Sequence, residues 1–365
     1  MPKNKGLNSA GVAKRDEFYT PYNVVEEEAE LHVSSFRGAS VLCNCDDPVE
    51  SNFVGYFLDN FNRLGLKGLY ATSYSCSHLA EMTVEASYYM SNLYIPGQAY
   101  GMSVTNVPND FCRTTDWRAL FDLEGNDLHR LDGDGDFRSP ECLDYLGRAD
   151  IVVTNPPFSL FRDFFQMVSD AGKRFLILGN VNVLTAKEVF PKFKSGELWI
   201  GKSIRSGDRK FYVPESYPMD ASVCGRDGEG RRFIRVKGVR WFTNLRDDSG
   251  FEDLPLVKAF NDDEYPCYEN YRAIEVRRTK FIPRDYFGVM GVPITFLDRY
   301  NPEQFEILML ANGNARTSTA PAVLEEVGYR RHPLDKGGVG IVDGKRVYAR
   351  VLIRRQHAPG RPLSA

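Results

Sequence analysis

The chain has 365 residues, of which 42% are hydrophobic and 26% charged, a composition ordinary for a soluble globular protein with more than one subdomain. A net charge of −3 and a pI near 6.0 give no global sign of nucleic-acid binding. No apolar stretch has the length of a membrane span or the character of a signal peptide, and the seven scattered cysteines favour reduced thiols. We therefore expect a cytoplasmic protein.

The first half of the chain alternates helices and strands. Residues 1–15 are expected to form a flexible arm, and "YTPYNVVEEEAELHV" then predicts a helix with Thr20 at the N-cap and Pro21 at the first helical position. "SVLCNC" and "KGLYATSY" predict strands, separated by a helix that ends near Gly65. "ADIVVTN" is a clear buried strand, followed by an amphipathic helix closed by Gly172 and by the strand "RFLILGN". This alternation predicts a parallel α/β sheet.

Two later regions have a different character. Residues 81–128 contain strand-like pieces without a clear helical crossover, and we interpret them as an insertion. After residue 192, short β-rich pieces separated by Pro, Gly and Asp replace the alternation. We expect a catalytic core over residues 16–201 and a mixed, β-rich region over residues 202–365, from which "GVPITFLD" and "FEILML" are candidates for the final strands of the core sheet.

An unusual junction, Asn155-Pro156-Pro157-Phe158, follows the strand "ADIVVTN" without a spacer. Ligands meet an open α/β sheet at the carboxyl ends of its strands, and two prolines hold the backbone extended and free of donors. The Asn155 side-chain oxygen and the Pro156 carbonyl can both accept from an amino group on a planar ring, with Phe158 stacked against it. This arrangement suits direct transfer of a methyl group from a sulfonium to an amino nitrogen. The alternative is a rigid turn with Phe158 in the core.

Three stretches are candidates for the site of a methyl donor. The first-turn NH groups of the first helix can receive a carboxylate, with plain helix capping as the alternative. The acidic end of "SVLCNCDDP" can bind amino or ribose groups or form a surface turn, and "LDGDGDFRS" offers a carboxylate and a ring for an adenine. No Gly-rich loop follows the first strand, which departs from the generic methyltransferase pattern. The candidate donor-binding residues are Tyr19, Thr20, Pro21, Asn44, Asp46, Asp47, Asp136 and Phe137.

We expect no metal. The aspartates of "LDGDGDFRS" mimic a calcium loop, but Phe137 stands where that loop needs Gly and Leu143 where it needs Glu. A zinc site is rejected because the spacing fits no standard finger, and buried thiols are the better interpretation. The residues concerned are Cys43, Cys45, Cys76 and His78.

Charge is concentrated locally in residues 202–240, where basic residues outnumber acidic ones and aromatic residues are interleaved. This pattern is compatible with a surface that faces phosphates, and a solvated face is the alternative. The candidate DNA-binding residues are Lys202, Arg205, Arg209, Lys210, Arg231, Arg232, Arg235 and Lys237.

Several motifs resemble, in the same order, those of the EcoRI-type adenine-specific DNA methyltransferase family: "DEFYTPY", "CNCDDP", "GDGDFRS", "ADIVVTNPPFSLFRDF", "WFTNL" and "GVMGVPITFLDRYNPEQFEI". The resemblance covers about residues 15–310, with a weaker match in "VYARVLIRR". It implies a class I S-adenosylmethionine-dependent, Rossmann-like core with an appended DNA-recognition region. It also implies transfer of a methyl group from S-adenosylmethionine to the N6 amino group of adenine in double-stranded DNA, after base flipping. The tetrapeptide at 155–158 matches the catalytic motif of the family, and all candidate donor residues except Asn44 lie in its donor motifs.

Two rival functions are weighed against this one. An amino-group methyltransferase can act on RNA or on a protein glutamine, but glutamine needs little recognition surface, and the second half of the chain is long and basic. A catalytically idle DNA-binding protein can retain the fold, but the intact Asn155 motif and Asp136 argue against it. Double-stranded DNA is the expected partner, with no membrane and no obligatory protein partner evident.

Overall fold

The protein is described by a computed structural model that covers residues 18–75, 95, 98–113, 116–205, 207–215, 217, 219, 222–245 and 250–356. The chain divides into two compact units. The first comprises residues 1–183 and 198–249, and the second comprises residues 184–197 and 250–365. Within the described residues, no helix combines the length and the apolar character that crossing a membrane requires.

The main feature of the first unit is an eight-stranded mixed sheet with the strand order β4-β3-β2-β1-β5-β6-β11-β7. The pairs β2–β1, β1–β5 and β5–β6 are parallel, and the outer pairs on both sides are antiparallel. The parallel α/β sheet predicted from the sequence is therefore confirmed for the four central strands, whereas the strands on both sides pair antiparallel and make the sheet mixed. The strands are β1 (Ser40–Asn44), β2 (Gly68–Thr72), β3 (Tyr100–Val104), β4 (Asp127–Arg130), β5 (Ile151–Thr154), β6 (Arg174–Asn180), β7 (Trp199–Ile200) and β11 (Val239–Thr243).

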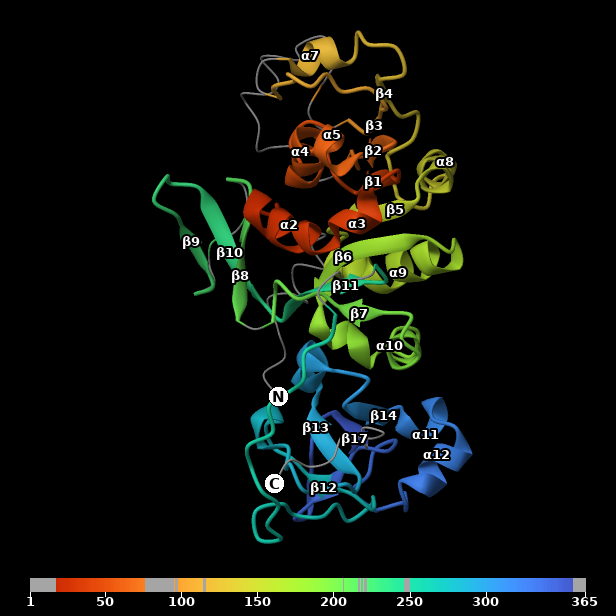
Figure 1. Ribbon diagram of the computed structural model, residues 1–365, viewed down its shortest axis with the longest axis vertical. Coiled ribbons are helices and arrows are strands. Elements are labelled where there is room, and N and C mark those ends of the chain that lie inside the picture. Colours follow the sequence, from red (N-terminus) through yellow and green to blue (C-terminus); the bar gives the residue numbers. More distant parts are fainter. Residues whose placement is uncertain are drawn as a thin grey trace. The chain divides into compact units, whose positions relative to one another are not determined.

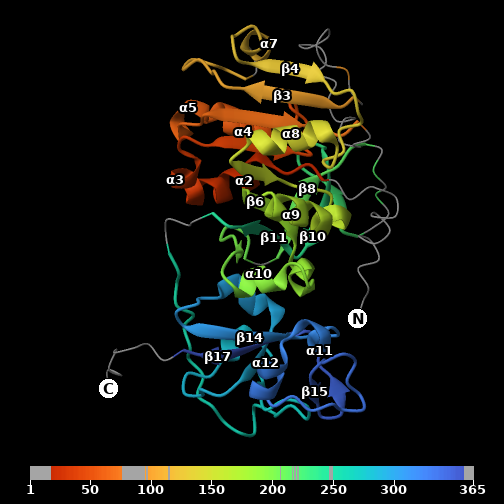
Figure 2. The ribbon, with the colours of Figure 1, turned by 90° about the vertical axis from the view of Figure 1, so that its right-hand side faces the viewer.

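Helices cover both faces of this sheet, with α2, α4 and α5 on one face and α8 and α9 on the other (Figures 1 and 2). Both faces are therefore apolar, and every residue of β1 and β5 is buried, which explains their continuous apolar runs. The helical segments of this unit are α2 (Tyr22–Ala29), η1 (Glu30–His32), α3 (Val33–Phe36), α4 (Asn52–Asp59), α5 (Phe61–Leu64), α7 (Trp117–Leu120), α8 (Pro140–Arg148), η3 (Phe158–Leu160) and α9 (Phe161–Asp170).

Local sequence signals explain where several of these helices begin and end. The Ser51 side chain accepts a hydrogen bond from the Phe53 amide at 3.0 Å and so caps the N-terminus of α4. The buried side chains of α9 follow the spacing i, i+3, i+4 and i+7, which turns one apolar stripe toward the sheet. Gly65 and Gly172, both with a φ of +64°, stand just after α5 and α9, where a left-handed residue ends a helix. The predicted ends at these two glycines are confirmed.

A separate three-stranded antiparallel sheet, with the order β8-β10-β9, belongs to the same unit. Its strands are β8 (Asp208–Tyr212), β9 (Cys224–Arg226) and β10 (Arg232–Lys237), and this small sheet projects at the left of Figure 1. One of its faces is buried through Phe211 and Val236, which join the main apolar core, while strand alternation turns the opposite face outward.

The second unit is built around a four-stranded sheet with the order β12-β13-β17-β14 and a two-stranded hairpin, β15-β16. Glu275 is buried beneath this sheet's surface, where the Tyr268 hydroxyl donates to it and the Arg350 guanidinium pairs with it at 2.7 Å. The elements are η4 (Val181–Thr185), which leads into the unit, α10 (Phe190–Lys194), β12 (Ile274–Glu275), η5 (Thr279–Phe281), β13 (Met290–Pro293), η6 (Ile294–Arg299), β14 (Phe305–Ala311), α11 (Ala315–Ser318), α12 (Pro321–Glu326), β15 (Ile341–Val342), β16 (Lys345–Arg346) and β17 (Arg350–Arg355).

The division of the chain differs from the predicted boundary at residue 201. The last strands of the main sheet are β7 and β11, and β11 comes from the predicted recognition region. "GVPITFLD" and "FEILML" do not supply core strands, because β13 and β14 both pair antiparallel with the C-terminal strand β17 of the second unit. That expectation was wrong. Within the predicted insertion, β3 is a strand of the main sheet, whereas residues 81–94 and the arm at 1–15 lie outside the described residues.

Candidate active site

The candidate active site lies where β1 and β5 end side by side. The crossover connections leave these two strands in opposite directions along the sheet, and open α/β sheets bind ligands in the crevice at such a reversal. Asp46 joins the two strand ends: one carboxylate oxygen accepts from the Ser51 hydroxyl at 2.7 Å and the other from the Thr154 hydroxyl at 2.6 Å. Asp46 is 8% exposed, so both bonds are shielded from water. Asp46 therefore holds the two strand ends together, and it also lines the adjoining cleft.

Asn155 follows β5 directly, and its side chain is held in one orientation. The Nδ2 group donates to the Phe18 carbonyl at 3.0 Å and to the Thr20 hydroxyl oxygen at 3.2 Å. Asn155 is 9% exposed, and its Oδ1 atom is buried. This atom has no hydrogen-bond partner within the described part of the chain. Buried polar atoms are almost always paired, so this oxygen is a candidate acceptor for a donor from outside the chain.

The two prolines and Phe158 complete this junction. Pro156 and Pro157 are both buried and lead without a break into the η3 turn, so the chain after Asn155 has no backbone donor for two residues. Phe158 is half-buried and meets the Phe18 ring edge to face, with 5.7 Å between the ring centroids. Phe158 packs against the main apolar core while part of the residue stays accessible, so its position is compatible with the core role as well as with the stacking role.

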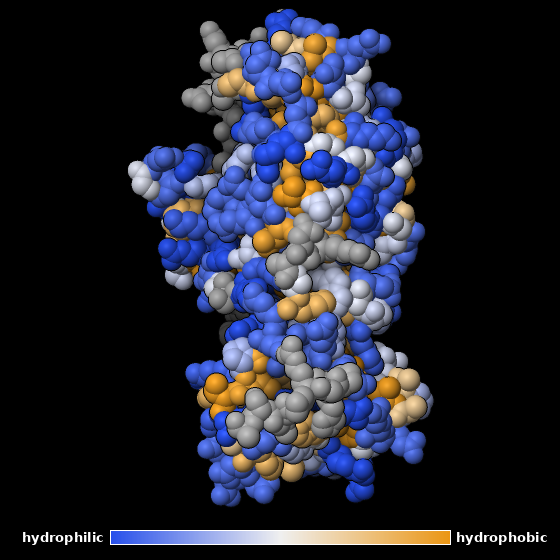
Figure 3. Space-filling view, in the orientation of Figure 1, coloured by the Kyte–Doolittle hydropathy of each residue, from blue (hydrophilic) through white to orange (hydrophobic). Residues whose placement is uncertain are grey.

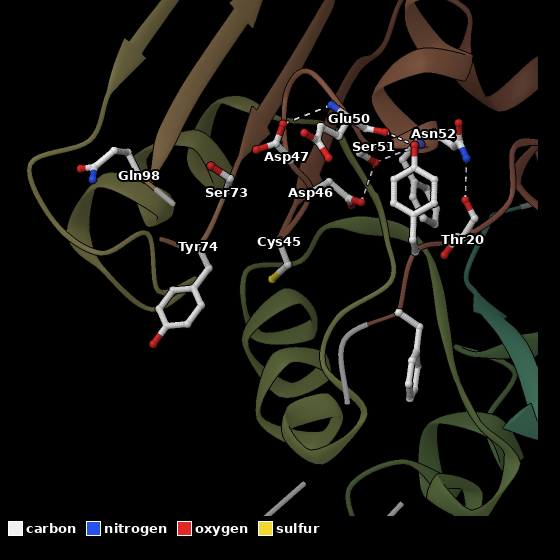
Figure 4. A pocket seen from close by; sticks show the side chains of 13 residues that line it. Thr20, Cys45, Asp46, Asp47, Glu50, Ser51, Asn52, Ser73, Tyr74 and Gln98 are labelled. Carbon is white, nitrogen blue, oxygen red and sulfur yellow. Dashed lines mark hydrogen bonds between the residues drawn. The ribbon is translucent and has the colours of Figure 1, made fainter. Parts of the chain in front are cut away.

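A small open cleft lies beside this junction, and Figure 4 draws the side chains that line it. Residues 155–158 do not line the cleft themselves, but Asn155 is hydrogen-bonded to its lining residues Phe18 and Thr20. Of the candidate donor-binding residues, Tyr19, Thr20, Asp46 and Asp47 line it, whereas Pro21, Asn44, Asp136 and Phe137 do not. The lining residues that were not among the donor-binding candidates are Phe18, Cys45, Glu50, Ser51, Asn52, Phe53, Ser73, Tyr74 and Gln98.

Helix α2 does not begin at the residue predicted from the sequence. Helix α2 begins at Tyr22, and Pro21 precedes it with φ −60° and ψ 146°, an extended conformation. The helix therefore starts two residues after Thr20, whose hydroxyl accepts from Asn155 instead of capping the first turn. The prediction of Thr20 as N-cap and Pro21 as first helical residue was wrong by about one position. Thr20 is a positioning residue for the Asn155 amide.

Two carboxyls at the start of the segment before α4 have different surroundings. One Asp47 oxygen accepts from the backbone amides of Val49 and Glu50, at 2.9 and 3.1 Å, and so closes a turn. Glu50 is 7% exposed, and its Oε1 atom is buried without a hydrogen-bond partner in the described structure. Burial, together with the neighbouring Asp47, raises the pKa of Glu50 to about 8. The adjacent Tyr19 hydroxyl donates to the Glu50 carbonyl, and burial raises the pKa of Tyr19 well above its ordinary value.

Asn44, Asp136 and Phe137 lie near the cleft without lining it. Asn44 is fully buried and accepts from the Thr72 hydroxyl at 2.7 Å. Asp136 pairs with Arg138 through both carboxylate oxygens, and Phe137 is 4% exposed with Arg138 over its ring. Their loop nevertheless packs against the cleft: a Cβ on Gly135, whose φ is +78°, would stand 1.9 Å from the carbonyl oxygen of the lining residue Ser73. The Asp136 loop is thus fixed at the cleft edge.

A candidate metal site is absent from the described part of the chain. Within the residues described, no group of three or more His, Cys, Asp or Glu is arranged to hold a metal ion. Cys43 is buried, and burial raises the pKa of its thiol. Cys76 and His78, the other members of the rejected zinc pattern, lie outside the described residues.

The small sheet β8-β10-β9 brings the two predicted basic groups together. Lys210 stands directly opposite Arg235 in the β8–β10 register, and both cations lie near the Phe233 ring, at 4.6 and 5.5 Å from its centroid. Lys237 is exposed on the same face of β10. These three cations make no ion pair with any described residue. We call Lys210, Arg235 and Lys237 the basic face; the surface over β8–β10 is largely hydrophilic (Figure 3).

The other predicted DNA-binding residues are already engaged within the protein. Arg231 pairs with Asp227 at 2.9 Å, and Arg232 pairs with Glu215 at 2.8 Å. Lys202 and Arg205 are half-buried, and Arg209 donates to a backbone carbonyl at 3.5 Å. These three side chains are therefore less accessible to a phosphate than those of the basic face.

Hydrogen bonds connect this sheet to the candidate active site. The backbone amide of Tyr19 donates to the Tyr212 carbonyl and the Tyr212 amide to the Tyr19 carbonyl, both at 3.0 Å. The segment Phe18–Thr20 therefore pairs with the end of β8 on one side and holds Asn155 on the other.

Comparison with known proteins identifies the family. The family model described as "Adenine-specific methyltransferase EcoRI" matches residues 6–356. The chain belongs to this family. The Type II methyltransferase M.EcoRI of Escherichia coli is 41% identical over 319 residues, which cover 85% of this chain and 90% of that protein. The Type II methyltransferases M.MpnI of Mycoplasma pneumoniae and M.MgeORF184P of Mycoplasma genitalium are 34% and 33% identical, each over 96% of this chain and 98% of its own length. No solved structure matches.

The family expected from the motifs is thus confirmed, and the chain is an adenine-specific DNA methyltransferase. The strand ends singled out from the sequence lie beside the cleft, and Tyr19, Thr20, Asp46 and Asp47 line it. The sequence analysis missed Ser73 and Tyr74, the last two residues of the predicted strand "KGLYATSY", and Glu50, which lies five residues after "SVLCNC". Proximity to the carboxyl ends of parallel strands was a signal for all three.

Proposed function

We propose that this enzyme transfers a methyl group from S-adenosylmethionine to the N6 amino group of an adenine in double-stranded DNA, with Asn155 holding that amino group. The observation that carries the proposal is the Asn155 side chain. Its Nδ2 group is committed to Phe18 and Thr20, which leaves a buried Oδ1 atom without a partner among the described residues. An adenine amino group supplies the missing donor.

The chemistry follows from what these residues can accept. Asn155 Oδ1 and the Pro156 carbonyl each accept one N–H of the adenine amino group, which turns the nitrogen lone pair out of conjugation with the ring. Phe158 stacks on the base. The bound donor supplies a methyl group on a sulfonium. The amino nitrogen forms the new bond to the methyl carbon as the carbon–sulfur bond breaks, and the sulfur keeps the electron pair. The nitrogen then releases one proton to water, so no strong base is needed before the transfer.

The residues that line the cleft support a donor of this kind. A sulfonium donor with an ammonium and a carboxylate has a net positive charge, and three carboxyls line the cleft: Asp46, Asp47 and Glu50. The hydroxyls of Ser73 and Tyr74, at the end of β2, are suited to a ribose or a base edge. The order of the central strands, which reverses between β1 and β5, supports the class I methyltransferase core that the motifs imply.

Adenine has to leave the duplex for this geometry to operate, because its amino group is paired and stacked in DNA. We propose that the basic face of β10 and β8 contacts phosphates, since its cations are exposed and Phe233 lies beneath them. The pairing of β8 with Tyr19 then connects the bound DNA to the segment that holds Asn155. The remainder of residues 202–365 is proposed to contribute to recognition.

Asn155→Ala tests this proposal by separating binding from transfer. Methyl transfer to duplex DNA is expected to fall by at least about 100-fold, because the hydrogen bond from the amino group to Asn155 matters most in the transition state, while donor affinity in calorimetry changes by less than about 3-fold. Asn23→Ala, a matched change at an exposed asparagine, is expected to leave both quantities unchanged. Comparable turnover in wild type and Asn155→Ala would reject the assignment.

A further inference from the structure

Glu50 is a buried carboxyl in the cleft whose state the transfer reaction does not explain. Its side chain is 7% exposed, yet its Oε1 atom has no hydrogen-bond partner among the described residues. Figure 4 shows it beside Asp46 and Asp47 in the cleft wall. A carboxyl oxygen shielded from water without a partner is costly, so its retention points to a partner that arrives from outside the chain.

The two neighbouring carboxyls already accept hydrogen bonds from the protein, whereas Glu50 has an oxygen that is unpaired in the described part of the chain. Asp46 accepts from the hydroxyls of Ser51 and Thr154, and Asp47 accepts from two backbone amides of its own turn. No basic side chain is present among the described residues that line the cleft. The cleft is therefore acidic, and it favours a cationic group over a carboxylate at this point.

The chemistry of the donor decides which cation Glu50 meets. A sulfonium carries charge but has no N–H or O–H, so it cannot satisfy an oxygen that needs a hydrogen-bond donor. An α-ammonium group carries both a positive charge and three N–H donors. We propose, on the basis of the proposed function, that Glu50 binds the α-ammonium group of S-adenosylmethionine and of its product S-adenosylhomocysteine.

This role implies that binding moves a proton. Burial and Asp47 raise the pKa of Glu50 to about 8, so the donor-free protein holds it protonated at pH 6.5. The other titratable groups around it are the half-buried Tyr19, whose pKa lies well above its ordinary value, and Asp46. The charge of Arg113 also acts on Tyr19 and lowers its pKa. An arriving ammonium stabilises the Glu50 carboxylate, and the carboxyl releases its proton to the solvent.

The test compares S-adenosylhomocysteine with its deaminated analogue, which lacks only the α-amino group. In calorimetry the wild type is expected to bind the amino form about 10- to 100-fold more tightly, as charged hydrogen bonds commonly do. Glu50→Gln is expected to lose a similar factor for S-adenosylhomocysteine and to distinguish the two ligands by less than about 3-fold. Glu26→Gln, the same change at an exposed glutamate, should behave as the wild type. Undiminished discrimination by Glu50→Gln would overturn the assignment of Glu50.

A second measurement needs no variant. At pH 6.5, where the free ligand's amino group is already protonated, titrations in buffers of different ionisation enthalpy count the protons released. Close to one proton is expected for S-adenosylhomocysteine and none for the deaminated analogue. Equal release by both ligands would contradict the role of Glu50. Failure of the wild type to bind either ligand would instead reject the proposed donor, so the two failures are distinguishable.

Discussion

Glu50→Gln is expected to stabilise the donor-free protein at alkaline pH while it weakens donor binding. The pKa of Glu50 rises from an ordinary 4.5 to about 8 in the folded protein, so the folded state keeps a proton that the unfolded chain releases. The stability that this group contributes is fully present below pH 4.5 and is lost as the pH rises through 8. The slope is about 1.4 kcal/mol of unfolding free energy per pH unit, or about 4 kcal/mol between pH 5 and pH 8.

Denaturant unfolding at four pH values between 5 and 8 measures this effect. Glutamine mimics the protonated carboxyl, so the variant should match the wild type near pH 5 and exceed it increasingly toward pH 8. Glu26→Gln, on the exposed side of α2, should follow the wild type throughout. If the stability difference between Glu50→Gln and the wild type does not grow with pH, the pKa of Glu50 is not raised and the reasoning about its burial fails.

Three further variants test other parts of the structure. Thr20→Val removes the hydroxyl that orients the Asn155 amide at 3.2 Å, and kcat is expected to fall by about 10-fold with little change in donor affinity. Gly201→Ala places a Cβ 2.2 Å from the buried Glu28 carboxylate, and overpacking of this kind should lower the unfolding free energy by about 3 kcal/mol in thermal unfolding. Neutralising the basic face with Lys210→Gln and Arg235→Gln should lower affinity for every DNA sequence. It should also flatten the plot of log affinity against log salt by about 0.9 for each phosphate that the variant no longer binds.

For each of these variants, one outcome would contradict the structural interpretation that it tests. A Thr20→Val enzyme with normal kcat would mean that the hydroxyl does not orient the amide. Wild-type stability of Gly201→Ala would show that Glu28 has room to move. Arg231→Gln is the control for the basic face, because Arg231 is already paired with Asp227. If it weakens DNA binding as much as the basic-face variant, phosphates are bound elsewhere on this sheet.

The sequence predicted those parts of the fold that local pattern determines. Strands β1, β2, β5 and β6 are short apolar runs separated by helical segments, so their type and order followed directly. The membership of β11 in the main sheet was not predictable in this way, since pairing between β6 and β11 is long-range and leaves no local signal. For the same reason, β13 and β14 were assigned to the wrong sheet: their partner β17 lies at the end of the chain.

The candidate site shows a similar division. The motif at 155–158 was readable because prolines after a buried strand restrict the backbone in a known way. The hydrogen bond between Asn155 and Thr20 was not, because it joins residues 135 positions apart. The proximity of Lys210 and Arg235 was not predictable either, because it depends on the register in which β8 pairs with β10. This register brings together two basic groups that are separate in the sequence.

The most direct test of the central claim is the identity of the methylated base. Purified wild-type protein is incubated with S-adenosylmethionine and unmethylated genomic DNA, and the DNA is digested to nucleosides for mass spectrometry, with Asn155→Ala in parallel. The added methyl group is expected to appear as N6-methyladenine, confined to one sequence context, and the variant is expected to produce almost none. Methyl groups on cytosine, or N6-methyladenine made equally well without the Asn155 side chain, would contradict it.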